Sequence, residues 1–337
     1  MKLSNTTIKV GTFNLFQFVK PPFSYYEKKD RFTQEQWSSK LSWIKSQILK
    51  MDCDVIGFQE VFSQSELRDL TYKLGFKYFH TADIPKTSPD DQFIYVTTTV
   101  AIASKYPIEN IHEVKPHKKS LKKHKFYKHF KFSRVPIKVD IRLKNNLLTT
   151  FYVCHLKSNR ENEFEYIFTK NTDLEEKKRA INKALSLNFS ESLRQRLCEA
   201  SSLYYDMKKL KNPFILLCDL NDKEFSATIE ALCSDKYHDD TKNDYKILTD
   251  AYYQHKKKIY NPHPEQKKPK RAPTSYFAGK GNVLDYIFIS KQFNKNYKYK
   301  IAKVSNYEIF DKEIKKHPDG SILTSDHAQV VCELMFS

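Results

Sequence analysis

The chain of 337 residues contains little glycine, six residues in all, and none of its six cysteines forms a CxxC pair. The scarcity of glycine excludes collagen-like and glycine-rich low-complexity sequence. The cysteine spacing argues against a zinc site or a disulfide framework, and Cys154, Cys218 and Cys332 lie inside apolar runs where a thiol acts as a small core residue. No apolar stretch approaches the roughly 18 residues of a membrane span, so we expect no stable membrane insertion.

The start of the chain also lacks a signal-peptide pattern, because a strand-like run follows Met1 almost at once. Together with the cysteine usage, this predicts a cytoplasmic protein. Hydrophobic residues make up 40% of the chain and aromatic residues 14%, which is enough for a packed core and excludes a disordered chain. No linker divides the sequence, and we expect one domain over residues 1–337 that acts as a monomer.

Positive charge is concentrated in three segments. Lys and Arg exceed Asp and Glu by 18; residues 115–134 carry nine Lys or Arg and no acid, residues 256–271 carry seven and one acid, and residues 291–303 carry five and no acid. The rest of the chain has a net charge of −2. We expect the first two to form basic insertions, near 112–133 and 255–273, that extend from the surface as loops or arms. Such a distribution favours a polyanionic partner, but charge alone does not separate nucleic acid from a membrane.

Apolar periodicity predicts strands and helices in mixed order. The opening run IKVGTFNLF is typical of a strand, apolar residues at helical spacing predict a helix from Gln36 to Lys50, and DVIGFQE predicts a second strand. Further strands are predicted at 96–103, 135–143, 147–156, 213–220, 282–290 and 328–336. The polar residues Lys144, Asn145 and Asn146 predict the turn of an antiparallel hairpin. This α/β pattern, with few helices between mixed strands, favours two packed sheets flanked by helices.

Two helices are predicted in the second half of the chain. Leu193, Leu197, Ala200, Tyr204 and Met207 share one helical face. We expect Ser190 to cap this helix, and a shorter helix is predicted after Asp222.

Polar residues stand at the ends of several buried strands. They are Asn14, Gln59, Glu60, His155, Asp219, Asn221, Asp285, Asp326 and His327. Taken singly, an Asp or Asn at a strand end is more often a turn or cap residue. Taken together, carboxylates, amides and imidazoles are what an oxygen-ligated divalent cation and a general base require.

Seven short motifs follow one another in a fixed order: TFNLF, FQEVF, FSRVPI, CHLKS, CDLND, LDYIF and SDH, over residues 12–327. In this order they resemble the endonuclease/exonuclease/phosphatase superfamily, which includes deoxyribonuclease I, apurinic/apyrimidinic endonucleases, neutral sphingomyelinases and inositol polyphosphate 5-phosphatases. The resemblance implies the DNase I-like fold, an α/β four-layer sandwich of two packed mixed β-sheets flanked by helices. The chain lacks the Trp-Cys-Asp-Arg segment of the 5-phosphatases and is more similar to the bacterial nuclease-like branch.

The resemblance implies a metal site and a reaction centre. Glu60 would be the principal carboxylate on Mg²⁺, or on Mn²⁺, with Asn14 and Asp326 as further ligands or close neighbours. Cys218 stands where the family usually has glycine, and we expect this small residue to do little harm.

The same resemblance assigns catalytic roles to five residues. Asp219 and Asn221 would position and activate the attacking water. His327 would bind or protonate a phosphoryl oxygen, with Asp285 orienting its ring. His155 would be a second imidazole at the phosphate, in some relatives the candidate acid for the leaving oxygen.

Substrate contacts are expected from the first basic segment. Arg134 matches a phosphate-contacting arginine of the deoxyribonuclease I branch, and guanidinium geometry suits phosphate. Four lysines that precede it would also contact phosphates: Lys118, Lys119, Lys122 and Lys123. The interleaved aromatic residues are Phe126, Tyr127, Phe130 and Phe132, which either stack on bases or pack the segment down.

We therefore predict a metal-dependent phosphodiesterase, and specifically a nuclease with a DNA or RNA substrate. The first alternative is a sphingomyelinase-like or other lipid or small-molecule phosphodiesterase or phosphatase of the same fold. An apolar hairpin exposed beside the active site, for which 93–96 is the segment to examine, would support the lipid substrate. The second alternative is a scaffold without catalysis, which is disfavoured because every expected catalytic position is filled.

Overall fold

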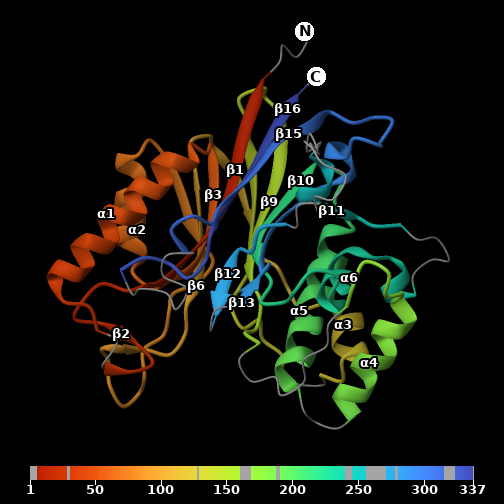
Figure 1. Cartoon of the computed structure of the whole chain (residues 1–337), viewed down its shortest axis with the longest axis horizontal. Helices are drawn as coiled ribbons and strands as arrows, with labels where there is room; N and C mark the ends of the chain where they lie inside the picture. The colour runs from red at the N-terminus through yellow and green to blue at the C-terminus, as the bar shows by residue number, and fades with distance from the viewer. Residues whose placement is uncertain are drawn as a thin grey trace, which may run out of the picture.

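The architecture is a sandwich of two β-sheets. The computed structural model describes residues 6–28, 31–126, 129–159, 168–186, 190–239, 245–255, 271–277, 280–314 and 323–336. Within these residues, two six-stranded sheets pack face to face in the middle of the molecule, with helices on both outer sides (Figure 1). This confirms the expected four-layer α/β sandwich.

The first sheet contains the N-terminal strand at its centre. Its order is β15 (Ala302–Phe310), β16 (Gln329–Phe336), β1 (Thr7–Phe18), β3 (Val55–Val61), β6 (Thr99–Ser104) and β4 (Tyr78–Thr81). The sheet is mixed, because β1 runs parallel to β3 and antiparallel to β16. The register of β1 and β3 places Asn14 opposite Gln59, the residue before Glu60.

The second sheet brings three motif residues into one row. Its order is β11 (Leu248–Asp250), β14 (Asp285–Ser290), β10 (Phe214–Asp219), β9 (Leu148–His155), β8 (Ile137–Arg142) and β7 (Ile108–His112). Asp219 ends β10 and is paired with His155 on one side and Asp285 on the other. The hairpin of β8 and β9 is antiparallel, as predicted from its polar turn.

The helices cover the outer faces of the sheets. They are α1 (Gln34–Met51), α2 (Gln64–Lys73), α3 (Lys118–Lys123), α4 (Leu174–Ser186), α5 (Glu191–Met207) and α6 (Ala227–Cys233). Apolar residues of α1 and α2 pack on the first sheet, and those of α4, α5 and α6 on the second. Thr33 and Gln36 form a reciprocal capping box at the start of α1. Ser190 is the residue before α5, but the prediction that it caps the helix is wrong, because its side chain makes no capping hydrogen bond.

Two short ladders project from the sandwich. Strand β2 (Ser24–Tyr25) pairs with β5 (Ile94–Tyr95), and β12 (Ser275–Phe277) pairs with β13 (Lys280–Asn282). The N-terminal end of β1 lies at the top of Figure 1, whereas β2 lies at the bottom, towards the ends of β1 and β3 that carry the polar motifs.

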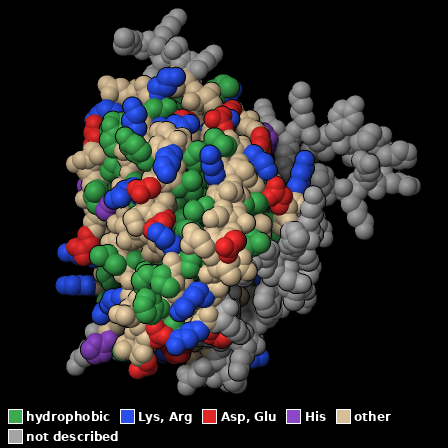
Figure 2. All heavy atoms as spheres, turned by 90° about the vertical axis from the view of Figure 1, so that its left-hand side faces the viewer, with side chains coloured by type: hydrophobic (Ala, Val, Ile, Leu, Met, Phe, Trp, Pro, Cys, Tyr) green, Lys and Arg blue, Asp and Glu red, His purple; other side chains and the backbone are tan. Residues whose placement is uncertain are grey.

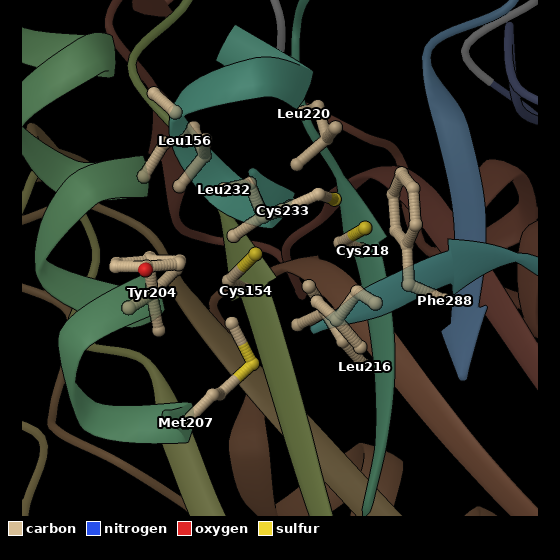
Figure 3. Packing of buried hydrophobic residues seen from close by; sticks show 14 of the residues in the cluster. Cys154, Leu156, Tyr204, Met207, Leu216, Cys218, Leu220, Leu232, Cys233 and Phe288 are labelled. Carbon is tan, nitrogen blue, oxygen red and sulfur yellow. The ribbon is translucent and has the colours of Figure 1, made fainter. Parts of the chain in front are cut away.

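Three cysteines, Cys154, Cys218 and Cys233, belong to the apolar layer between the second sheet and the helices that cover it. All six cysteines are buried free thiols. Cys154 and Cys218 project from neighbouring strands into this layer; Cys154 lies towards Tyr204 and Met207 of α5, and Cys218 lies towards Cys233 and Phe288 (Figure 3). The prediction that these cysteines act as small core residues is confirmed.

The basic segments differ from the expected loops. Residues 118–123 form the short helix α3 instead of an extended arm. Most of 256–271 lies outside the described residues; its last residue, Arg271, is buried between Asp250 and the ring of Tyr252. On the outer face that Figure 2 presents, Lys and Arg are interspersed with Asp and Glu. No helix of the described residues is long and apolar enough to cross a bilayer.

Glycine is used where the two sheets approach most closely. A Cβ added at Gly57 of β3 would lie 2.9 Å from Leu217 Cβ and 3.0 Å from Val153 Cγ2, both on the second sheet. We expect Gly57→Ala to lower the free energy of unfolding by roughly 1–3 kcal/mol, because the added methyl overpacks a dense interior. Urea denaturation measures this loss.

The matched test removes the two Val153 methyl groups that the new methyl meets, at 3.0 and 3.1 Å, and leaves Leu217 in place. Val153→Ala should itself destabilise, but in the Val153→Ala background Gly57→Ala should cost clearly less than it does alone. Additive losses in the double variant would contradict this explanation of the glycine.

Candidate active site

Asp219 is the centre of the polar cluster at the strand ends. Its side chain is 1% exposed and accepts hydrogen bonds from Asn14 Nδ2 at 3.0 Å and from the backbone N–H of Asn221 at 2.8 Å. His155 Nε2 lies 3.4 Å from the same carboxylate. Burial, followed by the nearby charge of Asp285, raises the pKa of Asp219 to about 7.

His327 is held by the carboxylate of Asp285, the contact that the family resemblance implies. Its Nδ1 lies 2.8 Å from Asp285 Oδ2, and both residues are buried. Thr274 Oγ1 accepts hydrogen bonds from the backbone N–H groups of Leu284 and Asp285, which fixes this carboxylate. The imidazole therefore has a set orientation beside Asp219, whose Oδ2 is 3.9 Å from Nδ1.

The two imidazoles of the site are electrostatically different. Burial opposes the charge of His327, but the charges of Asp285 and Asp326 prevail and raise its pKa well above the ordinary value. Burial, together with the charges of Arg134 and His327, lowers the pKa of His155 well below it. At neutral pH His327 is an imidazolium and His155 is neutral, so these residues suit different roles.

Glu60 faces the cluster from the first sheet. Its carboxylate accepts hydrogen bonds from Gln17 N at 3.0 Å and, more weakly, from Asn14 Nδ2 at 3.4 Å. Gln17, Glu60 and Asn221 all have positive φ, at 57°, 58° and 49°. Such non-glycine conformations cost on the order of 1–3 kcal/mol each and persist where the surroundings enforce them, often at functional sites.

Lys40 is a site neighbour that sequence reasoning missed. It projects from α1, is completely buried, and its Nζ donates to the carbonyls of Phe16 at 2.7 Å and Thr324 at 2.8 Å. Each carbonyl is two residues from a predicted metal ligand, Asn14 or Asp326. Burial lowers the pKa of Lys40 to about 7, although the charges of Glu60 and Asp326 act in the opposite direction. One feature of the sequence could have indicated that Lys40 is buried: it stands on the apolar face of the predicted helix, between Trp37 and Ile44.

Helix α5 supplies a second missed group on the other side of the sandwich. Glu199 is 1% exposed and accepts from the backbone N–H groups of Ser133 at 2.7 Å and Lys157 at 2.8 Å. One turn earlier, the buried Arg196 donates to the Lys157 carbonyl at 3.2 Å. This pair joins the segment that carries Arg134 to the loop that follows His155. In the sequence, these two charged residues stand three apart and next to the apolar positions Leu197 and Ala200 of the predicted helix.

The predicted phosphate-binding residues lie at unequal distances from the centre. Arg134 Nη1 donates to the carbonyl of Leu156 at 2.9 Å, next to His155, and its charge acts on that imidazole. The lysines of α3 are exposed; two of them also rest on aromatic rings, Lys119 on Tyr205 and Lys123 on Tyr237. The geometry thus brings Arg134 to the cluster, whereas the contacts of Lys119 and Lys123 are with Tyr205 of α5 and with Tyr237.

Two groups of side chains at these strand ends could hold a divalent cation. The first is the predicted set of Glu60, Asn14 and Asp326, rich in the oxygen donors that Mg²⁺ prefers. The second is Asp219, Asp285 and His327, whose donor atoms lie within 4.8 Å of one another. Asp285 Oδ1 is buried and accepts no hydrogen bond from the described residues. Both sets fit a hard cation, but the bond between His327 Nδ1 and Asp285 would compete with ligation in the second set.

The two-sheet fold, with carboxylates and imidazoles meeting where both sheets end, defines the DNase I-like class of hydrolases. The family model of the Endonuclease/Exonuclease/phosphatase family matches residues 11–327, and the chain therefore belongs to this family. Its members are phosphoesterase hydrolases. No curated protein matches the chain by sequence.

Solved structures support the same fold at low sequence identity. The human Nocturnin catalytic domain with bound sulfate is 16% identical, with 99% of this chain and 97% of that chain covered and a TM-score of 0.58. A humanized D. rerio TDP2 is 10% identical, with coverage of 97% and 98% and a TM-score of 0.57. A mannosyl-6-phosphatase of Bacteroides thetaiotaomicron is 14% identical, with coverage of 98% and 100% and a TM-score of 0.50.

Proposed function

We propose that this hydrolase is a Mg²⁺- or Mn²⁺-dependent phosphodiesterase that cleaves nucleic acid, either DNA or RNA. The observation that carries the proposal is the buried Asp219, whose carboxylate lies 3.4 Å from the His155 imidazole and 3.9 Å from that of His327. Phosphodiester hydrolysis needs a group that orients water and groups that stabilise negative charge on the phosphoryl oxygens. This cluster contains both.

The metal would be held by Glu60, Asn14 and Asp326. When bound, a divalent cation supplies positive charge to the phosphoryl oxygens and lowers the pKa of water. This set leaves His327 free to keep its hydrogen bond to Asp285.

The other residues have separate tasks in this proposal. Asp219, held by Asn14 and Asn221, orients the attacking water and takes its proton. The His327 imidazolium, oriented by Asp285, donates to a phosphoryl oxygen. His155, being neutral, donates a hydrogen bond to the phosphate and is poorly suited to protonate the leaving oxygen.

Affinity for a long polyanion would come from basic residues beside the cluster. Arg134 would contact the scissile or adjacent phosphate, and the exposed lysines of α3 would contact more distant phosphates: Lys118, Lys119, Lys122 and Lys123. We also propose monomeric action and a cytoplasmic location, the latter favoured by the six free thiols.

A lipid phosphodiester is the second candidate substrate. Phe93 and Val96 are 37% and 36% exposed, and the nearby Ile84 is 76% exposed. Exposed apolar residues around strand β5 are the feature that would favour contact with a bilayer.

A substrate panel tests the proposal. Purified protein with Mg²⁺ or Mn²⁺ should hydrolyse single-stranded DNA, double-stranded DNA or RNA, and EDTA should stop the reaction. Full activity in EDTA would contradict the metal-dependent mechanism. If every nucleic acid stays intact, the nuclease assignment is wrong. Hydrolysis of sphingomyelin would then indicate a lipid phosphodiesterase, and hydrolysis of a sugar phosphate would indicate a phosphatase.

A further inference from the structure

Three aromatic rings lie one beside the next, from the end of the strand that carries Glu60 out to the protein surface. Phe62, two residues after Glu60, is 2% exposed and forms the base of this stack. The centre of the Tyr25 ring lies 4.5 Å from that of Phe62, and the centre of the Tyr26 ring lies 3.9 Å from that of Tyr25; the ring planes are tilted by 50° and 39°, so the stack is a series of tilted contacts. Tyr26 is 59% exposed, so the stack ends in a ring that is open to solvent.

The stack stands beside the catalytic cluster. Burial is the main cause that raises the pKa of Tyr25, and the charges of Glu60 and Arg134 also act on its hydroxyl. Tyr25 therefore lies close to both the predicted metal carboxylate and the predicted phosphate-binding guanidinium. Tyr26 is the next ring outward from Tyr25 and faces solvent on this side of the cluster.

The backbone holds Tyr26 in an unfavourable conformation. Its φ is 61°, in the left-handed region that bulky residues avoid. Tyr26 N donates to the carbonyl of Tyr95 at 3.1 Å, and Glu27 N donates to that of Tyr25 at 2.8 Å, so the β2–β5 ladder enforces the turn. An exposed aromatic ring kept in such a conformation is not needed for core packing, and this points to a role in binding.

A groove beside the stack contains both aromatic and cationic groups. Its volume is about 700 Å³, and Phe62, Phe23 and Tyr95 line it together with Arg68 and with Lys20, whose Nζ is 2.9 Å from the carboxylate of Glu66, also in the lining. Aromatic faces next to cationic side chains match a chain of bases and phosphates better than they match a purely apolar tail.

We propose that Tyr26 is the platform on which an unpaired base stacks when the adjacent phosphate occupies the catalytic cluster. The substrate class is then single-stranded nucleic acid, because a paired and stacked base in a duplex does not offer its face to a side chain. This inference rests on the proposed nuclease function. It narrows that function to strands with accessible bases.

The test compares Tyr26→Ala with Tyr26→Phe, which retains the ring. Binding of a fluorescein-labelled single-stranded 12-nucleotide DNA is measured by fluorescence anisotropy in EDTA, so that no hydrolysis is required. Tyr26→Ala should raise Kd about tenfold, and Tyr26→Phe should bind like the wild type. With Mg²⁺, Tyr26→Ala should raise KM and leave kcat unchanged, because the ring contacts a base and not the reacting phosphate.

The control is Tyr72→Ala, which removes another exposed tyrosine, on α2, and should bind like the wild type. Equal Kd values for Tyr26→Ala and wild type would overturn the inference while leaving the nuclease proposal intact. Loss of binding to sphingomyelin-containing vesicles, with oligonucleotide binding unchanged, would also overturn it. The nuclease proposal itself fails in a different experiment: the wild-type protein would cleave no nucleic acid with either Mg²⁺ or Mn²⁺.

Discussion

Asp219→Asn is expected to lower kcat by on the order of 10²–10⁴-fold. The amide cannot take a proton from water, and one of the two donors that now face the carboxylate, Asn14 Nδ2 or Asn221 N, would meet another donor. His327→Ala should cause a loss of similar size, because it removes the imidazolium that faces the phosphoryl oxygen. Steady-state kinetics on the best substrate of the panel measures both.

A measurement of the free energy of unfolding distinguishes a loss of catalysis in Asp219→Asn from a loss of the folded state. Because burial raises the pKa of Asp219 to about 7, its ionisation at pH 8 weakens the folded state, and Asp219→Asn removes that charge. The unpaired donor acts in the opposite direction, so the free energy of unfolding at pH 8 should fall by no more than roughly 1–3 kcal/mol. Asp206→Asn is the matched control, since Asp206 bonds Lys138 and Tyr152 outside the cluster and should keep turnover. Wild-type turnover in Asp219→Asn would remove Asp219 from the chemistry.

The second large effect concerns the pH dependence of stability and arises from Lys40. Its pKa is about 7 in the folded protein, against 10.5 for a free lysine. Between these values the unfolded chain binds one more proton than the folded one, so stability must rise with pH. The free energy of unfolding of wild type relative to Lys40→Met should increase by at most ~1.4 kcal/mol per pH unit above about pH 7, and should be constant below it.

Urea denaturation in EDTA at pH 6, 7, 8 and 9 measures this difference. Lys45→Met removes an exposed amine from the same helix and should give a difference from wild type that is constant with pH. A constant difference for Lys40→Met as well would mean that the buried amine keeps its proton. The carbonyls of Phe16 and Thr324 would then be held by an ammonium ion.

Most of the fold was predictable because its strands are apolar runs that end in polar residues. The strands that carry the site, β1, β3, β9, β10, β14 and β16, all agree with predicted segments. The edge strands β15 and β7 were not predicted. In β15, exposed Lys303 and Glu308 alternate irregularly with buried residues, and in β7 four of five residues are exposed. Edge strands bury one face at most, and their composition is close to that of a loop.

The scarcity of glycine also had consequences that only the structure revealed. Ten described non-glycine residues have positive φ, and Gln17, Tyr26, Glu60 and Asn221 among them belong to or border the catalytic cluster. Sequence patterns do not report such conformations, because tertiary contacts and not local preference maintain them.

The sequence by itself determined the family, the order of the motifs and the identity of the polar residues, because these follow from residue type and spacing along the chain. The tertiary structure decided which of them meet. Strand register placed His155 and Asp285 on either side of Asp219. Packing from two outer helices brought Lys40 and Glu199 to the site. Contacts between residues tens or hundreds of positions apart depend on how the sheets and helices pack, and local patterns contain no record of them.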